Sequence, residues 1–187
     1  MVTDLRALNT LTAEDLHTVG GGYTSAHIYM VRKSEDPKLM VIAAELTPLQ
    51  APYVKRWERP DDEQMKHYLE YARQGYSMGA YVGETLVGLA LCEARTWNRS
   101  LWIWEFHVAP GCRRQGIGRA LMEAVVQQAH VAGFRIVGVE TQSTNVPAIA
   151  FYRAVGFELD GLDLSLYSNT DAEDGEVAFF MKRKLRG

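Results

Sequence analysis

Cysteine is scarce in this sequence of 187 residues, which contains only Cys92 and Cys112. Neither cysteine belongs to a Cys-x-x-Cys pair or to a cysteine and histidine pattern with the spacing of zinc ligands. A disulfide scaffold needs more cysteines than this, and a structural zinc site needs a tighter ligand cluster. The sequence therefore argues against a disulfide scaffold, and no metal ion is expected.

Runs of positive charge and of apolar residues are also short. The formal net charge is -3, the isoelectric point is about 6.0, and basic residues gather only in a tail at 182–186. A nucleic-acid-binding protein usually carries a basic patch, so no nucleic acid partner is expected.

Met1–Arg6 lacks the apolar core of a signal peptide, and the longest apolar run, near Leu86–Cys92, is too short to cross a bilayer. We therefore expect no membrane partner and a cytoplasmic protein.

What the sequence does contain is typical of a folded globular protein. Hydrophobic residues make up 47% of the chain, charged residues make up 23%, and the mean hydropathy is -0.17. This composition supports a packed core, and the length is usual for one domain. We expect a single domain spanning residues 1–187.

The first third of the chain predicts short strands and a short helix separated by turns. A short strand is expected at Leu5–Leu8, and Thr12 with Asp15 three residues later predicts the start of a helix. Two β-rich runs, Ala26–Arg32 and Lys38–Leu46, indicate a hairpin with its turn at 34–37.

The rest of the chain predicts a meander followed by a crossover. Helices are expected at 60–74, 117–132 and 147–155, and strands at 76–82, 86–92, 101–108, 135–140, 157–167 and 176–185. Antiparallel strands followed by one strand-helix-strand unit indicate an α/β (α+β) protein, with a mixed sheet flanked by helices.

One stretch between a predicted strand and a predicted helix has the features of an anion site. Arg113–Arg119 reads Arg-Arg-Gln-Gly-Ile-Gly-Arg, with two glycines and three arginines. Glycine lets the backbone approach a ligand closely, and the first turn of a helix offers unpaired N–H groups and a positive dipole end. A phosphate-bearing ligand is expected, although a tight strand-to-helix turn would also explain the glycines. The spacing matches neither the Walker A pattern nor the dinucleotide pattern.

A second group of residues lies near the start of the helix at 147–155. Offsets of three and four place Asn145, Ala148 and Tyr152 on one side of this helix, where an amide and a phenol face the same neighbour. The alternative is an amphipathic helix whose tyrosine only packs.

These two groups together resemble the GCN5-related N-acetyltransferase (GNAT) family. The resemblance is carried by Val108-Ala-Pro-Gly-Cys-Arg-Arg-Gln-Gly-Ile-Gly-Arg-Ala-Leu121 and by Asn145-x-x-Ala148-x-x-Phe151-Tyr152-x-x-x-Gly156-Phe157. The chain is most similar to the streptothricin acetyltransferase branch, through Trp97-Asn98, Val139-Glu-Thr-Gln142, Gly161-Leu-Asp163, Leu166-Tyr167 and Glu176-Val-Ala178. The resemblance covers 77–185, which would form the acetyl-CoA-binding core, and leaves 1–76 as a variable N-terminal part.

The resemblance implies a fold, a co-substrate and a set of contacts. The GNAT fold has a mixed, mostly antiparallel sheet of about seven strands with a splayed pair, flanked by helices on both faces. Acetyl-CoA would place its pyrophosphate on the amides of the loop and its pantetheine arm beside the preceding strand. Many relatives are dimers, so the resemblance also implies a homodimer. The implied contacts are Phe106, His107, Val108, Arg113, Arg114, Gln115, Gly116, Ile117, Gly118, Arg119, Asn145 and Tyr152.

Acetyl transfer to an amine needs a base, an oxyanion donor and a proton for the leaving thiolate. Glu105 lies among tryptophan and phenylalanine, where an apolar setting suits a carboxylate acting as a base. Glu140 ends the next strand and is the rival base, while His107 ranks below both. By resemblance, Tyr152 protonates the thiolate and a backbone N–H near Val108 holds the oxyanion.

The acceptor is the least defined part of the prediction. Streptothricin carries a β-lysine amine in a strongly cationic molecule, so an acidic rim from Glu158, Asp160 and Asp163 would suit it. Trp97 and Tyr167 are candidates for walls of the acceptor pocket. The acidic residues at 171–176 are interpreted as a solvated loop, with no role at the site.

Three functions follow from this reading. The leading one is an N-acetyltransferase that acts on a small cationic amine such as streptothricin by direct attack in a ternary complex. The second keeps the chemistry and takes a protein lysine or N-terminal amine. The third, of another class, is a catalytically silent CoA-binding module.

Overall fold

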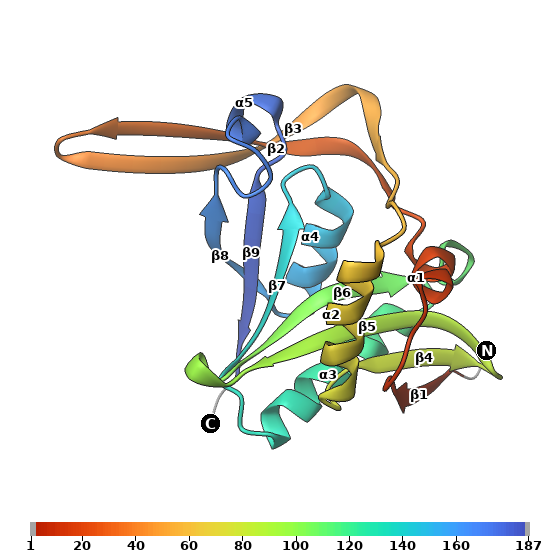
Figure 1. Cartoon of the computed structure of the whole chain (residues 1–187). Helices are drawn as coiled ribbons and strands as arrows, with labels where there is room; N and C mark the ends of the chain where they lie inside the picture. Colours follow the sequence, from red (N-terminus) through yellow and green to blue (C-terminus); the bar gives the residue numbers. More distant parts are fainter. Residues whose placement is uncertain (1–2, 186–187) are drawn as a thin grey trace. The chain divides into compact units, whose positions relative to one another are not determined.

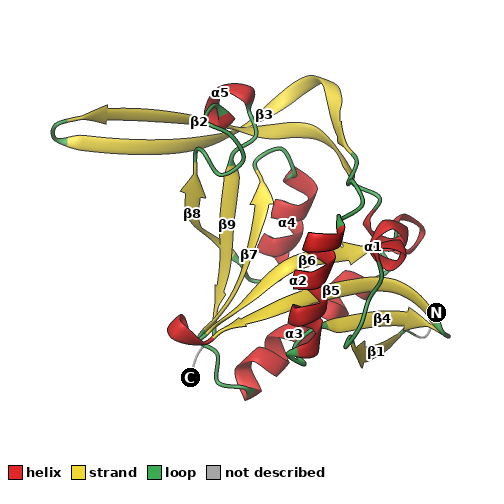
Figure 2. Ribbon diagram, viewed as in Figure 1, coloured by secondary structure: helices red, strands yellow, loops and turns green. Residues whose placement is uncertain are grey.

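A computed structural model describes residues 3–185 of the chain. Figures 1 and 2 show its helices and strands. The strands are β1 Asp4–Ala7, β2 Tyr23–Asp36, β3 Leu39–Lys55, β4 Met78–Val82, β5 Thr85–Arg95, β6 Ser100–Val108, β7 Ile136–Gln142, β8 Glu158–Asp163 and β9 Ala178–Lys184. The α-helices are α1 Ala13–Gly20, α2 Asp62–Arg73, α3 Ile117–Val131, α4 Val146–Ala154 and α5 Asp171–Asp174.

Seven of the strands form a mixed sheet in the order β1-β4-β5-β6-β7-β9-β8, and β2 and β3 form a separate two-stranded sheet. The β1-β4, β4-β5, β5-β6 and β8-β9 pairs are antiparallel, whereas β6 and β7 pair in parallel. This confirms the predicted α+β fold with a mixed, mostly antiparallel sheet of about seven strands.

The chain forms two compact units. The first contains 1–21, 56–139 and 183–187, and the second contains 22–55 and 140–182. In the first unit α1 and α2 contact β5, with α2 in front of the strands in Figure 1, and α3 packs behind them. The core under α1 and α2 is an apolar cluster of buried residues: Leu8, Leu11, Leu16, Val19, Tyr68, Ala72, Leu89 and Leu91.

The second unit contains the β2-β3 hairpin, α4 and the β8-β9 pair. The hairpin contacts α4 and α5, and Tyr29 of β2 packs its ring at 5.6 Å from the ring of Phe179 in β9. Phe157 and Phe179 are among the largest fully buried side chains of the protein. The base of the hairpin is therefore anchored in the apolar core of its own unit.

The sequence signals for helix boundaries are confirmed where side chains cap the ends. Thr12 accepts a hydrogen bond from the N–H of Asp15, and Asp15 accepts one from the N–H of Thr12, so α1 begins with the predicted capping box. Asp61 caps α2 by accepting from Gln64 N at 2.8 Å. No helix within residues 3–185 is long and apolar enough to span a bilayer.

The hairpin is confirmed, but its predicted turn at 34–37 is wrong. Ser34, Glu35 and Asp36 continue β2 and pair with Val41, Met40 and Leu39 of β3. The turn consists of Pro37 and Lys38, because Asp36 Oδ1 accepts from the N–H groups of Lys38 and Leu39 at 2.8 and 3.1 Å. Both strands are consequently longer than the sequence indicates.

Candidate active site

The outer half of β6 carries the first group of predicted site residues. The parallel ladder between β6 and β7 joins Ser100–Ile103 to Ile136–Val139 and stops there. Beyond it, the one strand partner of β6 within residues 3–185 is β5, and a register shift in this pairing leaves Trp104 as an extra residue between Ile103 and Glu105. Such a bulge re-aims the side chains that follow it. The strand therefore presents Glu105–Val108 without a β7 partner, as expected for a splayed strand beside the pantetheine arm.

Glu105 is held at both carboxylate oxygens. Tyr68 donates its hydroxyl to Oε1, and His107 Nε2 lies 2.6 Å from Oε2. The side chains of Glu105 and His107 are 23% and 14% exposed, so solvent reaches both only in part. The Trp57 ring packs edge-on to the His107 ring, with 6.4 Å between the ring centroids. The arrangement joins a carboxylate and an imidazole in one hydrogen-bonded pair that can hold and pass a proton.

Tyr68 is a member of this group that the sequence interpretation missed. The side chain comes from α2, is buried, and accepts a hydrogen bond from Gln64 Nε2 at 2.9 Å. Burial and the negative charge of Glu105 raise the pKa of Tyr68, so its hydroxyl keeps its proton and remains a donor. The available signal was its position on the apolar face of α2, because a buried tyrosine hydroxyl usually has a polar partner.

The loop that follows β6 has the backbone geometry of an anion cradle. Arg114 and Gly116 both have positive φ, at 61° and 86°, and the space beside Gly116 is open within 4 Å of where a Cβ would stand. Helix α3 begins at Ile117 without a side-chain cap on its first N–H groups. Amide groups in this arrangement suit a phosphate group, so the predicted residues fit the pyrophosphate of acetyl-CoA.

Arg113 has a different setting from the rest of the loop. Its guanidinium donates to Val108 O at 2.8 Å and to Gly20 O at 3.0 Å, and burial lowers the pKa of this side chain. Arg113 thus ties the end of α1 to the end of β6 inside the first unit. Its direct contact with acetyl-CoA stays a prediction.

The remaining polar side chains of the loop lie at the surface. Gln115 donates to Gly111 O at 3.1 Å, which closes the turn before α3. Arg119 lies one helical turn from Glu123, with 3.8 Å between Nη1 and Oε1. Their contacts with acetyl-CoA, like that of Gly118, stay predictions.

Helix α4 in the second unit carries Asn145 and Tyr152. Asn145 is the N-cap, and its Oδ1 accepts from Ala148 N at 3.3 Å. Tyr152 is buried, with its ring near those of Phe151 and Phe157. Capping and packing therefore explain part of this motif, and the roles of Asn145 toward CoA and of Tyr152 as an acid stay predictions.

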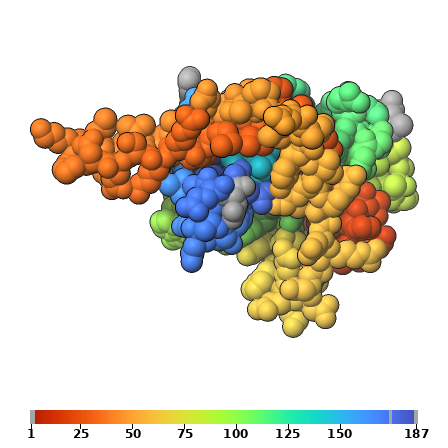
Figure 3. All heavy atoms as spheres, turned by 90° about the horizontal axis from the view of Figure 1, so that it is seen from above, coloured from red at the N-terminus to blue at the C-terminus, as the bar shows by residue number. Residues whose placement is uncertain are grey.

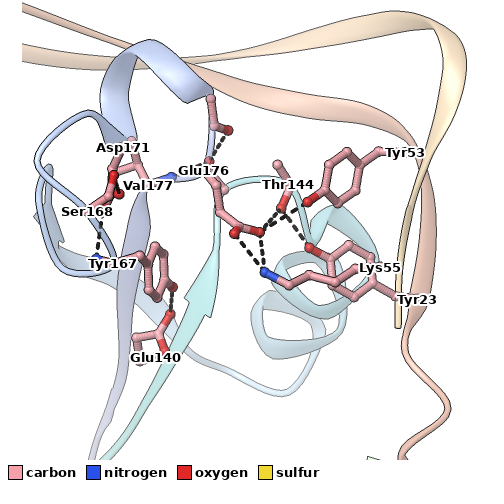
Figure 4. Close-up of polar contacts among 12 residues, drawn as sticks. Tyr23, Tyr53, Lys55, Glu140, Thr144, Tyr167, Ser168, Asp171, Glu176 and Val177 are labelled. Carbon is pink, nitrogen blue, oxygen red and sulfur yellow. Dashed lines mark hydrogen bonds and ion pairs between the residues drawn. The ribbon is translucent and has the colours of Figure 1, made fainter. Parts of the chain in front are cut away.

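Glu140 and Tyr167 meet in the second unit, as Figure 4 shows. Tyr167 donates its hydroxyl to Glu140 Oε1, and burial together with the Glu140 charge raises the pKa of Tyr167. The rival base and a predicted acceptor residue are thus joined in one hydrogen bond. Their roles in the reaction stay predictions.

A second carboxylate group in the same unit went unrecognised in the sequence. Lys55 Nζ lies 2.7 Å from both oxygens of Glu176, and Tyr53 and Thr144 donate to Oε1 at 3.4 and 3.2 Å (Figure 4). Tyr23 shares a 2.6 Å hydrogen bond with Thr144. Tyr53 and Lys55 lie more than a hundred positions from Glu176 in the sequence, a separation that no local pattern can bridge.

The interpretation of residues 171–176 as a solvated loop is therefore wrong for two of its members. Glu176 forms the ion pair just described, and Asp171 is buried. Burial opposes the charged form of Asp171, but hydrogen bonds from Ser168 Oγ and from backbone N–H groups outweigh it and lower the pKa. Asp171 fixes the turn before α5 by accepting from Tyr167 N at 2.8 Å.

The other predicted acceptor residues belong to different units of the chain. Trp97 belongs to a single turn of 3-10 helix in the first unit and is 84% exposed. In the second unit Asp160 pairs with Lys182 at 2.7 Å, and Asp163 accepts from Ser165 N at 3.0 Å. Asp160 is therefore partly neutralised, and the acidic rim stays a prediction.

Comparison with known proteins identifies the class to which this fold and site belong. The family model described as "Acetyltransferase (GNAT) family" matches residues 43–157, which is more than half of the chain. The chain belongs to this family, so the predicted resemblance is confirmed.

Particular relatives extend over nearly the whole chain. Streptothricin acetyltransferase of Streptomyces lavendulae is 32% identical over 184 residues, which cover 95% of this chain and 93% of that protein. The crystal structure of nourseothricin acetyltransferase aligns with a TM-score of 0.76 at 29% identity and covers 100% of both chains. A Bacillus anthracis relative solved with acetyl coenzyme A has a TM-score of 0.74 at 21% identity, covering 98% and 100%.

These findings establish the reaction class and the co-substrate. The protein is a GNAT N-acetyltransferase, a family that uses acetyl-CoA as the acetyl donor. A small-molecule amine is the acceptor class that the relatives imply.

Proposed function

We propose that this enzyme transfers the acetyl group of acetyl-CoA to a primary amine of a small cationic antibiotic, with streptothricin as the leading candidate. The observation that carries this proposal is the full-length relatedness to streptothricin and nourseothricin acetyltransferases. The relatedness includes the N-terminal third, where acceptor selection often resides in this superfamily. A relative that shared only the acetyl-CoA-binding core would not support a particular acceptor.

Glu105 and His107 together are the proposed proton acceptor. The carboxylate at 2.6 Å from His107 Nε2 stabilises the positive charge that the imidazole gains when it takes a proton. Tyr68 keeps the carboxylate oriented from its other oxygen. Acetyl-CoA supplies a thioester carbon that a deprotonated amine can attack. This assignment raises the rank of His107, which the sequence alone placed below the two glutamates.

The rest of the site has roles that the motifs support. The amides of Arg114–Arg119 hold the pyrophosphate, and Phe106–Val108 line the arm of the co-substrate. Tyr152 donates its hydroxyl proton to the departing thiolate. Glu140, held by Tyr167, binds the acceptor or serves as the alternative base. Transfer is direct in a ternary complex, as the family resemblance implies, and Cys92 is no nucleophile because it is buried and its pKa is raised.

An acceptor screen tests the proposed function. The purified enzyme is given acetyl-CoA with streptothricin, an aminoglycoside, a polyamine, a lysine peptide or a peptide with a free N-terminus. CoA release and the product mass are measured for each. We expect kcat/KM to be highest with streptothricin, and acetylation of either peptide alone would reassign the acceptor. Firm acetyl-CoA binding without any turnover would favour the silent CoA-binding module.

The proposal includes a cytoplasmic enzyme, where acetyl-CoA is made and used. It also includes a homodimer, whose interface is argued next from a different part of the molecule.

A further inference from the structure

The end of the β2-β3 hairpin stands apart from the core of its unit. Every residue from Arg32 to Ala43 is exposed, although these residues form regular strand pairs. Figure 3 shows this orange segment extending beyond the blue and teal parts of the same unit. A two-stranded ribbon alone in water is only marginally stable. An exposed ribbon of this length therefore calls for a further packing partner.

The base of the hairpin differs from its end. Val31 is 7% exposed, and Tyr29 accepts a hydrogen bond from Arg153 Nη1 at 2.7 Å. The anchored base holds the end in a fixed direction instead of leaving a free loop. A rigidly presented strand loses little conformational freedom on pairing, which favours association.

Charge is unevenly divided between the two strands of the exposed end. The β2 side carries Arg32, Lys33, Glu35 and Asp36, whereas Leu39–Ala44 of β3 is apolar without interruption. Successive residues of a strand point to opposite faces, so β3 is apolar on both faces. Leu39 is 60% exposed and Met40 is 74% exposed. Natural edge strands usually carry a charge or proline that prevents pairing, and this run has neither.

The outer edge of β3 also has unpaired backbone groups. In residues 3–185 the hairpin forms a two-stranded sheet, so β3 has β2 as its one strand partner. Pro48 and Pro52 lack the N–H that a second partner would need, and both lie toward the base. The edge that can accept another strand is therefore confined to the apolar run near the turn.

We propose that this edge of β3 pairs in antiparallel orientation with the same edge of a second copy of the chain, giving a four-stranded β2-β3-β3-β2 sheet and a two-fold dimer. The run is uncharged, so pairing it with itself sets no like charges against each other. A lysine, Lys38, borders the run at the turn, and Glu45 borders it at the other end. Antiparallel pairing brings Lys38 toward Glu45 of the second copy, whereas parallel pairing would bring like charges together.

The two-fold axis must pass near the centre of the run, at Val41 or Ile42. A substitution there meets its own copy, which gives the proposal a sharp test. The contact is a short strand edge, smaller than the roughly 1,200–2,000 Å² that stable interfaces bury, so the dimer should dissociate on dilution in the micromolar range.

The experiment is sedimentation velocity over a concentration series with the full-length wild type, Val41→Lys and Ser34→Lys. Ser34 pairs with Val41 on the same face of the hairpin but lies on β2, so it is a matched control for added charge. We expect a concentration-dependent dimer for the wild type and for Ser34→Lys. For Val41→Lys we expect a dimer dissociation constant at least tenfold higher than that of the wild type. An equimolar mixture of Val41→Lys with Val41→Glu should restore the dimer.

Three outcomes would overturn the proposal. One is a wild type that stays monomeric at all concentrations. Another is an equal loss in Val41→Lys and Ser34→Lys, which would indicate packing through the hairpin face. The last is a dimer that Val41→Lys leaves unchanged. Retained acetyl-CoA binding and an unchanged circular dichroism spectrum show that each variant is folded.

Discussion

The two units each hold a partly buried glutamate, but they hold it in different ways. Glu105 accepts from a phenol and lies beside an imidazole, while Glu176 lies against the ammonium of Lys55. Within residues 3–185, the ion-pair partner of Glu105 is His107, which is charged only when protonated. Glu176 therefore lies beside a positive charge, that of Lys55, whereas Glu105 has a positive partner only when His107 carries a second proton.

This difference separates a chemical role from a structural one. A carboxylate beside lysine is stabilised as an anion and gains nothing from a change in protonation. A carboxylate beside histidine can stabilise the imidazolium that forms when the ring takes a proton. Under the proposed function, the Glu105 group serves the reaction, whereas the Glu176 group joins the base of the hairpin to the segment before β9.

The largest expected effect comes from removing charge at each glutamate in turn. Glu105→Gln should lower kcat by about 10²–10⁴-fold, because general base catalysis contributes on that scale. Glu176→Gln should leave kcat within about threefold and lower the melting temperature instead. Steady-state kinetics and thermal unfolding of both variants measure the contrast.

Glu93→Gln is the matched control, because Glu93 is a partly buried carboxylate on the neighbouring strand β5. It should keep nearly full activity. Equal losses of kcat in Glu105→Gln and Glu176→Gln would erase the distinction between the two groups.

A hydroxyl in the second unit provides the next contrast. Tyr152→Phe should lower kcat by about 10–100-fold, since it removes the proposed proton donor to the thiolate, while acetyl-CoA binding changes little. Stopped-flow or calorimetric binding beside steady-state rates separates the two effects. Tyr53→Phe is the control from the same unit, because Tyr53 belongs to the Glu176 group, which has no proposed part in the transfer. A parallel loss of acetyl-CoA affinity and rate would give Tyr152 a packing role.

Breaking the ion pair from its other side tests the structural half of the comparison. Lys55→Met leaves Glu176 without its counter-charge, and both side chains are about a quarter exposed, at 27% and 26%. We expect a loss of about 2 kcal/mol in the free energy of unfolding, below the value for a fully buried pair. The double variant Lys55→Met/Glu176→Gln should lose less than Lys55→Met, as urea unfolding would show. A double variant as unstable as the sum of the single ones would exclude a pairwise interaction.

The smallest effect concerns alkaline pH. Burial and Glu105 raise the pKa of Tyr68 above its unfolded value, so this tyrosine contributes stability that is present below about pH 10 and is lost as the pH rises further. Tyr68→Phe removes that contribution. The variant should be destabilised by about 1 kcal/mol near neutral pH and by less near pH 11. A destabilisation that grows with pH would contradict the assigned direction.

Much of the fold follows from local signals that tertiary contacts reinforce. The capping box at Thr12 and the glycines after α1 and α3 mark helix ends, and the run before the arginine-rich loop is a strand as predicted. The hairpin turn was misplaced because Ser34 and Asp36 favour turns locally, while cross-strand pairing with β3 extends the strand past them. Cross-strand pairing therefore outweighs the local turn preference of these residues.

The site divides in the same way. The loop and the Asn145 to Tyr152 spacing are local, so the sequence reveals them. Tyr68 is separated from Glu105 by 37 positions, and Lys55 from Glu176 by 121, so those partners become visible only in the folded chain. The chemistry of a carboxylate depends on such partners, which is why the sequence could name Glu105 without choosing its mechanism.

The effect of His107→Gln on kcat for the amine acceptor tests the central claim most directly. The kcat and the acetyl-CoA affinity are measured in the wild type and in His107→Gln, which keeps polarity at the position and cannot accept a proton. We predict that kcat falls by about 10²–10⁴-fold in His107→Gln while the acetyl-CoA affinity changes little. An unchanged kcat in His107→Gln would contradict a proton acceptor built from Glu105 and His107.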